Sequence, residues 1–166
     1  AKGTVFVVHG YFDHSALYRH LFSYLLERGY AVVTFDLPGH GLSDGERASI
    51  ASFDHYVEAF DSLLAACTNH LPQPWHAVGQ STGGAIVLKH LLEERDGQSL
   101  FQHIALLAPL LHTRGWGRGR LTYRLLRPFI SRIKRRFTTN SADAAFLKFL
   151  KHSDPLQSRH IPLEWV

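Results

Sequence analysis

Methionine is absent from this chain of 166 residues, cysteine occurs once, and a long central stretch has no acidic residue. Because the chain opens at Ala1 and holds no Met, we expect that it is not a complete translation product. The single cysteine, Cys67, excludes an internal disulfide, and its place on the apolar face of a predicted helix favours a buried, unreactive thiol. No apolar run approaches the ~20 residues that cross a bilayer, so we expect no transmembrane segment.

The charged residues are unevenly distributed. Nine Lys and Arg residues lie between Arg114 and Arg136, whereas no Asp or Glu occurs from Gly97 to Ala142. This basic segment predicts either contact with an anionic lipid surface or a solvated helical face whose acidic partners lie elsewhere in the fold. Few aromatic residues are interleaved with the arginines, so we expect no nucleic-acid partner.

A hydrophobic content of 45% supports one compact domain, in which short apolar runs alternate with helical patterns. Ser15 is the predicted N-cap of the first helix, and Gly29 and Gly97 are predicted to end the first and third helices. The alternation predicts a parallel sheet covered by helices, an α/β fold. Strands are predicted at 4–8, 31–35, 75–78 and 103–107, and helices at 16–28, 53–70 and 83–95.

After Pro109 the pattern changes. A stretch rich in glycine and arginine, 114–120, precedes helical patterns over 121–133 and 142–150, and no strand pattern occurs there. We interpret residues 1–110 as a partial core, residues 111–157 as a helical cap, and residues 158–166 as the start of a return to the core.

The segment Gly79-Gln80-Ser81-Thr82-Gly83 fits the pattern G-x-S-x-G between a predicted strand and a predicted helix. Such a turn strains the serine and leaves no room for side chains at the flanking positions, so both are glycine. The N-terminus of the following helix points at the same place, where it would stabilise a developing oxyanion. A plain glycine-rich turn is the alternative, but the strand and helix around it favour a nucleophilic Ser81.

The loop His9-Gly10-Tyr11-Phe12-Asp13-His14 follows the first predicted strand. An acyl-transfer site needs two N–H donors for the oxyanion, one after the nucleophile and one from this loop. Those residues would be Thr82 and Tyr11. For His9 we favour a structural role, in which the imidazole braces the loop by hydrogen bonds.

A third motif, Asp36-Leu37-Pro38-Gly39-His40-Gly41-Leu42-Ser43-Asp44-Gly45, lies between the second strand and its helix. Together the three motifs resemble the α/β-hydrolase superfamily. They are most similar to its monoacylglycerol lipase and lysophospholipase-like branch, which overlaps with the serine aminopeptidase-like group. The resemblance covers Gly3 to Pro109 well, and extends more loosely to Ser153-Asp154-Pro155-Leu156, which looks like the exit from a cap.

This resemblance implies an α/β-hydrolase fold with Ser81 as nucleophile, Tyr11 and Thr82 as oxyanion donors, and a cap that roofs an acyl pocket. It also implies that the acid and histidine of the triad follow later strands that this chain does not contain, and that the family's first strands are missing too. Asp154 matches the cap exit and not the catalytic acid. His112, His152 and His160 lie in or beside the cap, where we expect surface or pocket-lining residues.

The full-length protein is therefore expected to hydrolyse carboxylic esters of monoacylglycerol-like or lysophospholipid-like lipids through an acyl-enzyme, whereas residues 1–166 alone should be nearly inactive. We expect no cofactor, since neither metal-ligand spacing nor a phosphate loop with its lysine occurs. Two alternatives stay open: a peptidase or acyltransferase on the same fold, and a non-catalytic module that self-associates through exposed sheet edges. We expect a cytoplasmic protein, peripheral to membranes if the basic segment meets lipid.

Overall fold

The computed structural model describes residues 1–93, 99–111, 123–137 and 141–163. Four strands form a parallel sheet in the order β2-β1-β3-β4. Each strand lies within two residues of its predicted bounds, so the expected parallel α/β arrangement is confirmed. The strands are β1 (Thr4–Val8), β2 (Ala31–Thr34), β3 (Trp75–Gln80) and β4 (Phe101–Leu107).

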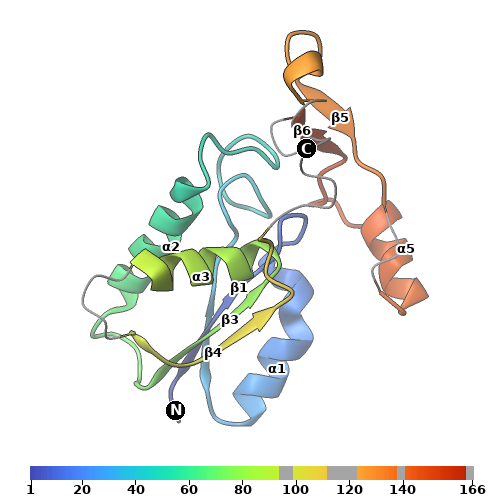
Figure 1. Cartoon of the computed structure of the whole chain (residues 1–166). Coiled ribbons are helices and arrows are strands. Elements are labelled where there is room, and N and C mark those ends of the chain that lie inside the picture. Colours follow the sequence, from blue (N-terminus) through green and yellow to red (C-terminus); the bar gives the residue numbers. More distant parts are fainter. Residues whose placement is uncertain (94–98, 112–122, 138–140, 164–166) are drawn as a thin grey trace.

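Helices cover both faces of this sheet, with α1 on one face and α2 and α3 on the other (Figure 1). Gly29, with a φ of +85°, follows α1 and ends it as predicted. The predicted end of the third helix at Gly97 lies outside the described residues. None of the described helices is long and apolar enough to cross a bilayer. The helices are α1 (Arg19–Glu27), preceded by the short 3₁₀ turn η1 (Ser15–Tyr18), then α2 (Asp54–Cys67) and α3 (Thr82–Glu93).

The predicted N-cap at Ser15 is wrong. His14 and Tyr18 are the N-cap residues of η1 and α1, and neither makes a side-chain capping hydrogen bond. Ser15 instead donates from its backbone N–H (2.7 Å) and from its hydroxyl to Asp36 Oδ1. A charged acceptor 21 residues away has replaced the local capping bond.

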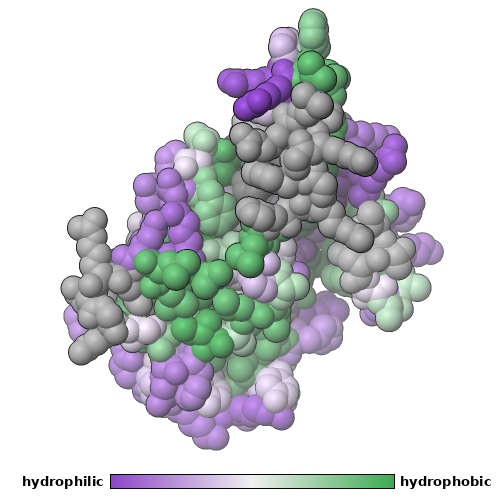
Figure 2. All heavy atoms as spheres, in the orientation of Figure 1, coloured by the Kyte–Doolittle hydropathy of each residue, from purple (hydrophilic) through white to green (hydrophobic). Residues whose placement is uncertain are grey.

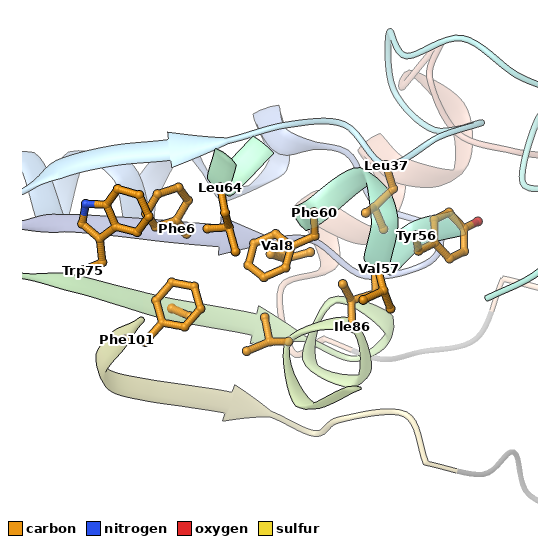
Figure 3. Close-up of a cluster of buried hydrophobic side chains, with 12 residues drawn as sticks. Phe6, Val8, Leu37, Tyr56, Val57, Phe60, Leu64, Trp75, Ile86 and Phe101 are labelled. Carbon is orange, nitrogen blue, oxygen red and sulfur yellow. The ribbon is translucent and has the colours of Figure 1, made fainter. Parts of the chain in front are cut away.

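The hydrophobic core lies between the sheet and the helices α2 and α3 (Figure 3). The ring of Phe60 lies between those of Phe35 and Phe101, at an interplanar angle of 15° to each. Cys67 is half-buried and packs against this cluster, which raises the pKa of its thiol by desolvation. The buried members are Phe6, Val8, Leu37, Tyr56, Val57, Phe60, Leu64, Trp75, Ala77, Ile86, Val87 and Phe101.

Within its described residues, the cap segment has one long element, α5 (Ala144–His152), and two short strands, β5 (Arg132–Lys134) and β6 (His160–Pro162), which pair antiparallel. Of the predicted helix over 121–133, residues 123–126 are helical, but 127–129 form a turn and β5 begins at Arg132. The expectation that this segment has no strand is therefore wrong. Because β6 pairs with β5, residues 160–162 lie with the cap, while the boundaries at 110 and 157 remain predictions. Figure 1 shows these elements beyond the carboxyl ends of the sheet strands.

Candidate active site

Ser81 lies at a sharp turn between β3 and α3, as the motif predicts. Its φ is +52°, a left-handed conformation that costs free energy for a residue with a side chain. The turn is held on both sides, since the Ser81 N–H donates to the Leu107 carbonyl (2.9 Å) and the Ser81 carbonyl accepts from the Leu110 N–H (3.0 Å). The residue is half-buried, so it is not sealed inside the core.

The glycines on either side of this turn are needed because backbone atoms occupy the space of a side chain. A Cβ on Gly79 would lie 2.6 Å from the Gly83 carbonyl oxygen, and one on Gly83 would lie 2.1 Å from the Val8 carbonyl oxygen. The predicted clash at both positions is confirmed. It arises from the close approach of α3 to β1 and β3.

The two predicted oxyanion donors follow neighbouring strands. β1 and β3 pair in parallel with Val8 opposite Gly79, so the residues after both strands meet at the same edge of the sheet. Thr82 is the first residue of α3, where backbone N–H groups have no acceptor within the helix and the positive end of the helix dipole lies. The structure thus brings Tyr11 and Thr82 to the edge that carries Ser81, while their role as donors stays a prediction.

Tyr11 is held in the loop after β1 by its side chain. Its hydroxyl donates to the Ala48 carbonyl, and its ring packs edge-on against those of Phe12 and His40. The side chain is buried, and a turn in which the Asp13 N–H donates to the Gly10 carbonyl (3.0 Å) closes the loop. The Tyr11 backbone therefore has a defined position beside the sheet edge.

A hydroxyl that the sequence analysis did not single out joins this loop to the turn at Ser81. The Tyr18 hydroxyl lies 2.8 Å from Asp13 Oδ2 and 3.0 Å from Gln80 Oε1, and it accepts from the Gly10 N–H at 3.2 Å. Gln80 precedes Ser81, and a Cβ on Gly10 would lie 2.2 Å from Gln80 Oε1. Burial, and secondly the Asp13 charge, raise the pKa of Tyr18 above its usual range, so the hydroxyl keeps its proton.

His9 braces the loop, which confirms the structural role favoured from the sequence. Its Nε2 accepts from the Leu37 N–H (2.9 Å), so the proton is on Nδ1, which donates to the Gly10 carbonyl (2.8 Å). Burial lowers the pKa of His9 to about 4. The imidazole is therefore neutral at pH 7 and joins the loop after β1 to the loop after β2.

Asp36 organises the third motif. Its carboxylate accepts from the backbone N–H groups of Ser15 (2.7 Å) and Leu42 (2.8 Å). Burial acts to raise the pKa of Asp36, but the hydrogen bonds from Ser15 and Leu42 outweigh it and leave the pKa lowered. A Cβ on Gly41 would lie 2.0 Å from Asp36 Oδ2, which explains that glycine. The motif that begins at Asp36 therefore joins the loop after β2 to the start of η1.

The cap segment contacts the loop after β1 at two places. Asp154 is buried, and its Oδ2 lies 3.0 Å from His14 Nε2 and accepts from Gln157 Nε2 at 3.0 Å. The Arg135 guanidinium lies 3.7 Å from the centre of the Phe12 ring, a cation–π contact. The cap is therefore anchored to the same loop that carries Tyr11.

No histidine within the described ranges is hydrogen-bonded to the Ser81 hydroxyl. His9 and His14 have other partners, and His152 and His160 are exposed in the cap. His112 lies outside the described residues. The part of the chain that the structure describes also contains no group of three or more His, Cys, Asp or Glu side chains that could hold a metal ion.

The arrangement of strands, helices and the turn at Ser81 is that of the α/β-hydrolase fold, and known structures agree. The crystal structure of a monoacylglycerol lipase from Paleococcus ferrophilus superposes with a TM-score of 0.76 at 24% identity, covering 98% of this chain and 62% of that one. At this identity the likeness shows the fold alone. The fold class predicted from the three motifs is confirmed.

The family follows from the sequence. The family model described as "Serine aminopeptidase, S33" matches residues 1–166, and the chain belongs to this family. It is 33% identical over 90 residues to a monoacylglycerol lipase of Mycolicibacterium smegmatis, covering 54% of this chain and 32% of that protein. It is 32% identical over 111 residues to human monoglyceride lipase, covering 66% of this chain and 36% of that protein. The chain thus spans about a third of the length of these relatives, and the resemblance to the monoacylglycerol lipase-like branch is confirmed.

Proposed function

We propose that the full-length protein is a serine hydrolase that cleaves carboxylic esters, with Ser81 as its nucleophile. The observation that carries the proposal is the left-handed Ser81 (φ +52°), which stands half-buried between β3 and the first turn of α3. A strained serine at a strand-to-helix turn places its hydroxyl where a carbonyl group can approach the helix N-terminus.

In this proposal the Ser81 oxygen attacks the ester carbonyl carbon while a base takes its proton. The tetrahedral oxyanion accepts hydrogen bonds from the N–H groups of Tyr11 and Thr82. The ester C–O bond then breaks, the alcohol leaves with the proton, and water hydrolyses the acyl-enzyme to release the acid. Losing one oxyanion donor typically costs ~10² to 10³ in rate, so the fixed position of the Tyr11 loop would matter for kcat.

Serine needs a base, and the proposal assigns that base to no described residue of this chain. Residues 1–166 alone should therefore be nearly inactive. Full-length protein is needed for every activity measurement.

The relatives named monoacylglycerol and monoglyceride lipases support monoacylglycerol-like or lysophospholipid-like esters as substrates, with the cap over an acyl pocket. The description of the family model favours a second candidate, a peptidase, and an acyltransferase would use the same turn. Hydrolysis rates on a monoacylglycerol, a lysophospholipid and an aminoacyl anilide would rank these classes.

Labelling of the full-length protein with a fluorophosphonate tests the nucleophile. We expect labelling in the wild type and none in Ser81→Ala. The matched control is Ser62→Ala, which removes an exposed hydroxyl on α2 and should leave labelling unchanged. Labelling that survives Ser81→Ala would overturn the proposal.

A non-catalytic assembly module is the remaining alternative, and the edge of the sheet favours it. β4 is an edge strand, and apolar side chains gather over α3 and β4 (Figure 2). Leu92 is 77% and Leu107 49% exposed. Two results together would favour the assembly module. Size-exclusion chromatography would show oligomers that dissociate in the Leu107→Asp variant, and no fluorophosphonate would label the protein.

Peripheral contact between the cap and anionic lipid is a further part of the proposal, because the described arginines of the basic segment include the exposed Arg124 and Arg127. Activity on anionic micelles should then fall as salt rises. Activity that does not change with salt would argue against this contact. The cytoplasmic location stays a prediction.

A further inference from the structure

A basic hollow of about 420 Å³ lies in the cap between the β5–β6 pair and the C-terminal end of α5. Its described lining has five Lys and Arg side chains, one histidine and one aromatic ring, and no carboxylate. The lining residues are Lys134, Arg135, Arg136, Phe137, Lys151, His152 and Arg159.

Two of the cations are fixed in place. Arg135 donates to Gln157 Oε1 (2.7 Å), and its guanidinium lies 4.4 Å from the centre of the Phe137 ring. Arg159 lies on the same ring at 5.4 Å and donates to the Lys151 carbonyl. Burial lowers the pKa of Arg135 to about 10, so the group is still charged at neutral pH. These contacts give both guanidinium groups a defined position beside the Phe137 ring.

The remaining cations come from two different elements. Lys134 is the last residue of β5, Arg136 follows that strand, and Lys151 lies in the last turn of α5. All three are exposed. Cations at a helix C-terminus offset the helix dipole, which accounts for Lys151. That effect does not account for Lys134 and Arg136, so the hollow gathers more positive charge than α5 requires.

No carboxylate is among the described lining residues of the hollow, and the two that attract Arg135, Asp13 and Asp154, lie outside that lining. Asp154 is buried and accepts hydrogen bonds from the Leu156 N–H and Gln157 Nε2, and it contacts His14. Asp13 attracts the Arg135 guanidinium more strongly than Arg159 repels it, whereas the attraction of Asp154 is weaker than that repulsion. Like charges held together in one hollow repel one another, and a bound anion relieves that repulsion.

We propose that this hollow binds a phosphate-bearing anion, with the Lys134, Arg136 and Lys151 side chains closing on its oxygens over the two fixed guanidiniums. Phosphate matches this donor set because its oxygens accept both the paired N–H groups of arginine and the point charge of lysine. The site does not depend on the ester hydrolysis at Ser81, and it includes residues beyond the basic segment noted in the sequence.

The test is a binding measurement on full-length protein, with two sources of phosphate. One arm measures co-flotation of the protein with phosphatidylcholine vesicles that either contain or lack phosphatidic acid. The other titrates the protein with glycerol 3-phosphate, with acetate as the control anion. We expect Arg136→Glu and Lys151→Glu to weaken phosphate binding by about tenfold or more. Arg124→Glu makes the same charge change on the cap outside the hollow and should weaken it less than about twofold.

Binding in the vesicle arm alone assigns the site to a lipid headgroup, and binding in the soluble arm assigns it to a free phosphate ester. Either result supports the proposal, provided that Arg136→Glu and Lys151→Glu weaken the binding. Equal losses in Arg124→Glu, or equal binding of acetate, would show diffuse attraction and overturn it, as would no binding in either arm. The Ser81→Ala variant should bind as the wild type does, so that failure of the catalytic proposal leaves this one standing.

Discussion

The sheet region and the cap are held in place by different interactions. Residues 1–110 contain a continuous apolar cluster with aromatic rings in contact, whereas the described cap has only Leu150 and Leu163 among its buried apolar residues. The cap is held to the rest of the chain by directional polar contacts. These include His14 with Asp154, Arg135 over Phe12, and Arg132 with Glu46.

This difference predicts different responses to substitution. An apolar core distributes its stabilisation over many contacts, and each side chain removed leaves a cavity. A segment held by a few polar contacts depends on each of them, and a change at one shifts the position of the whole segment. Because both cap contacts are made to the loop that carries Tyr11, we expect the position of the cap to affect the geometry of the proposed oxyanion site.

The largest contrast is expected between two phenylalanines on helices. Phe60 in α2 is fully buried, while Phe149 in α5 is 42% exposed. We expect Phe60→Ala to lower the free energy of unfolding by about 3–5 kcal/mol, and Phe149→Ala by less than about 1 kcal/mol. Chemical denaturation of the full-length variants measures both. Equal losses would mean that the cap is packed as tightly as the core.

The second prediction concerns pH. The pKa of His9 is about 4 in the folded protein against an ordinary value of 6.5, so protonation favours the unfolded state. The stability that the neutral imidazole contributes is complete above pH 6.5 and is lost as pH falls toward 4, by about 3 kcal/mol. Denaturation midpoints over this range should fall in the wild type and fall less in His9→Gln. His55→Gln, at an exposed position on α2, should keep the wild-type slope.

The third prediction tests the polar anchor of the cap. Asp154→Asn keeps the shape of the side chain but removes the charge that His14 contacts. We expect a loss of about 2 kcal/mol, because hydrogen bonds to charged groups contribute about 1.5–3 kcal/mol. Asp143→Asn is the matched control in the cap, since Asn caps helix α5 as well as Asp does. Indistinguishable denaturation curves for the two variants would remove Asp154 as an anchor.

The sheet and the turn at Ser81 could be predicted because their signals are local. Buried strands such as Thr4–Val8 read as apolar runs, and the glycines at 79 and 83 reflect backbone contacts within one turn. The bonds between loops could not be predicted. Ser15 has the sequence of an N-cap, but its acceptor is Asp36, which only the folded sheet brings near.

The cap was harder to predict for the same reason. β5 and β6 are three residues each, Arg-Ile-Lys and His-Ile-Pro, too short to show alternation. Their pairing joins residues that are far apart in the chain, since Arg132 faces Pro162, Ile133 faces Ile161 and Lys134 faces His160. A strand stabilised only by such a distant partner carries no signature in its own residues.

Tyr18 shows how a residue of the candidate site stayed hidden. It lies between the apolar residues of the predicted first helix, and no motif includes it. Its hydroxyl nevertheless joins Asp13 and Gly10 in the loop to Gln80 beside Ser81. Tyr18→Phe removes this oxygen alone. We expect a loss of only about 1 kcal/mol in stability, the smallest effect predicted for any of these contacts.

The catalytic readout separates positioning from simple stability. If Tyr18 sets the loop for the transition state, kcat of Tyr18→Phe on a monoacylglycerol should fall about tenfold while KM stays nearly constant, because the oxyanion forms only after binding. Tyr24→Phe removes an exposed hydroxyl from the neighbouring helix α1 and should leave both constants unchanged. A Tyr18→Phe enzyme with wild-type kcat would mean that the loop holds its position without this hydroxyl. The contacts of Tyr11 with Ala48 and of His9 with Leu37 would then suffice to order the site.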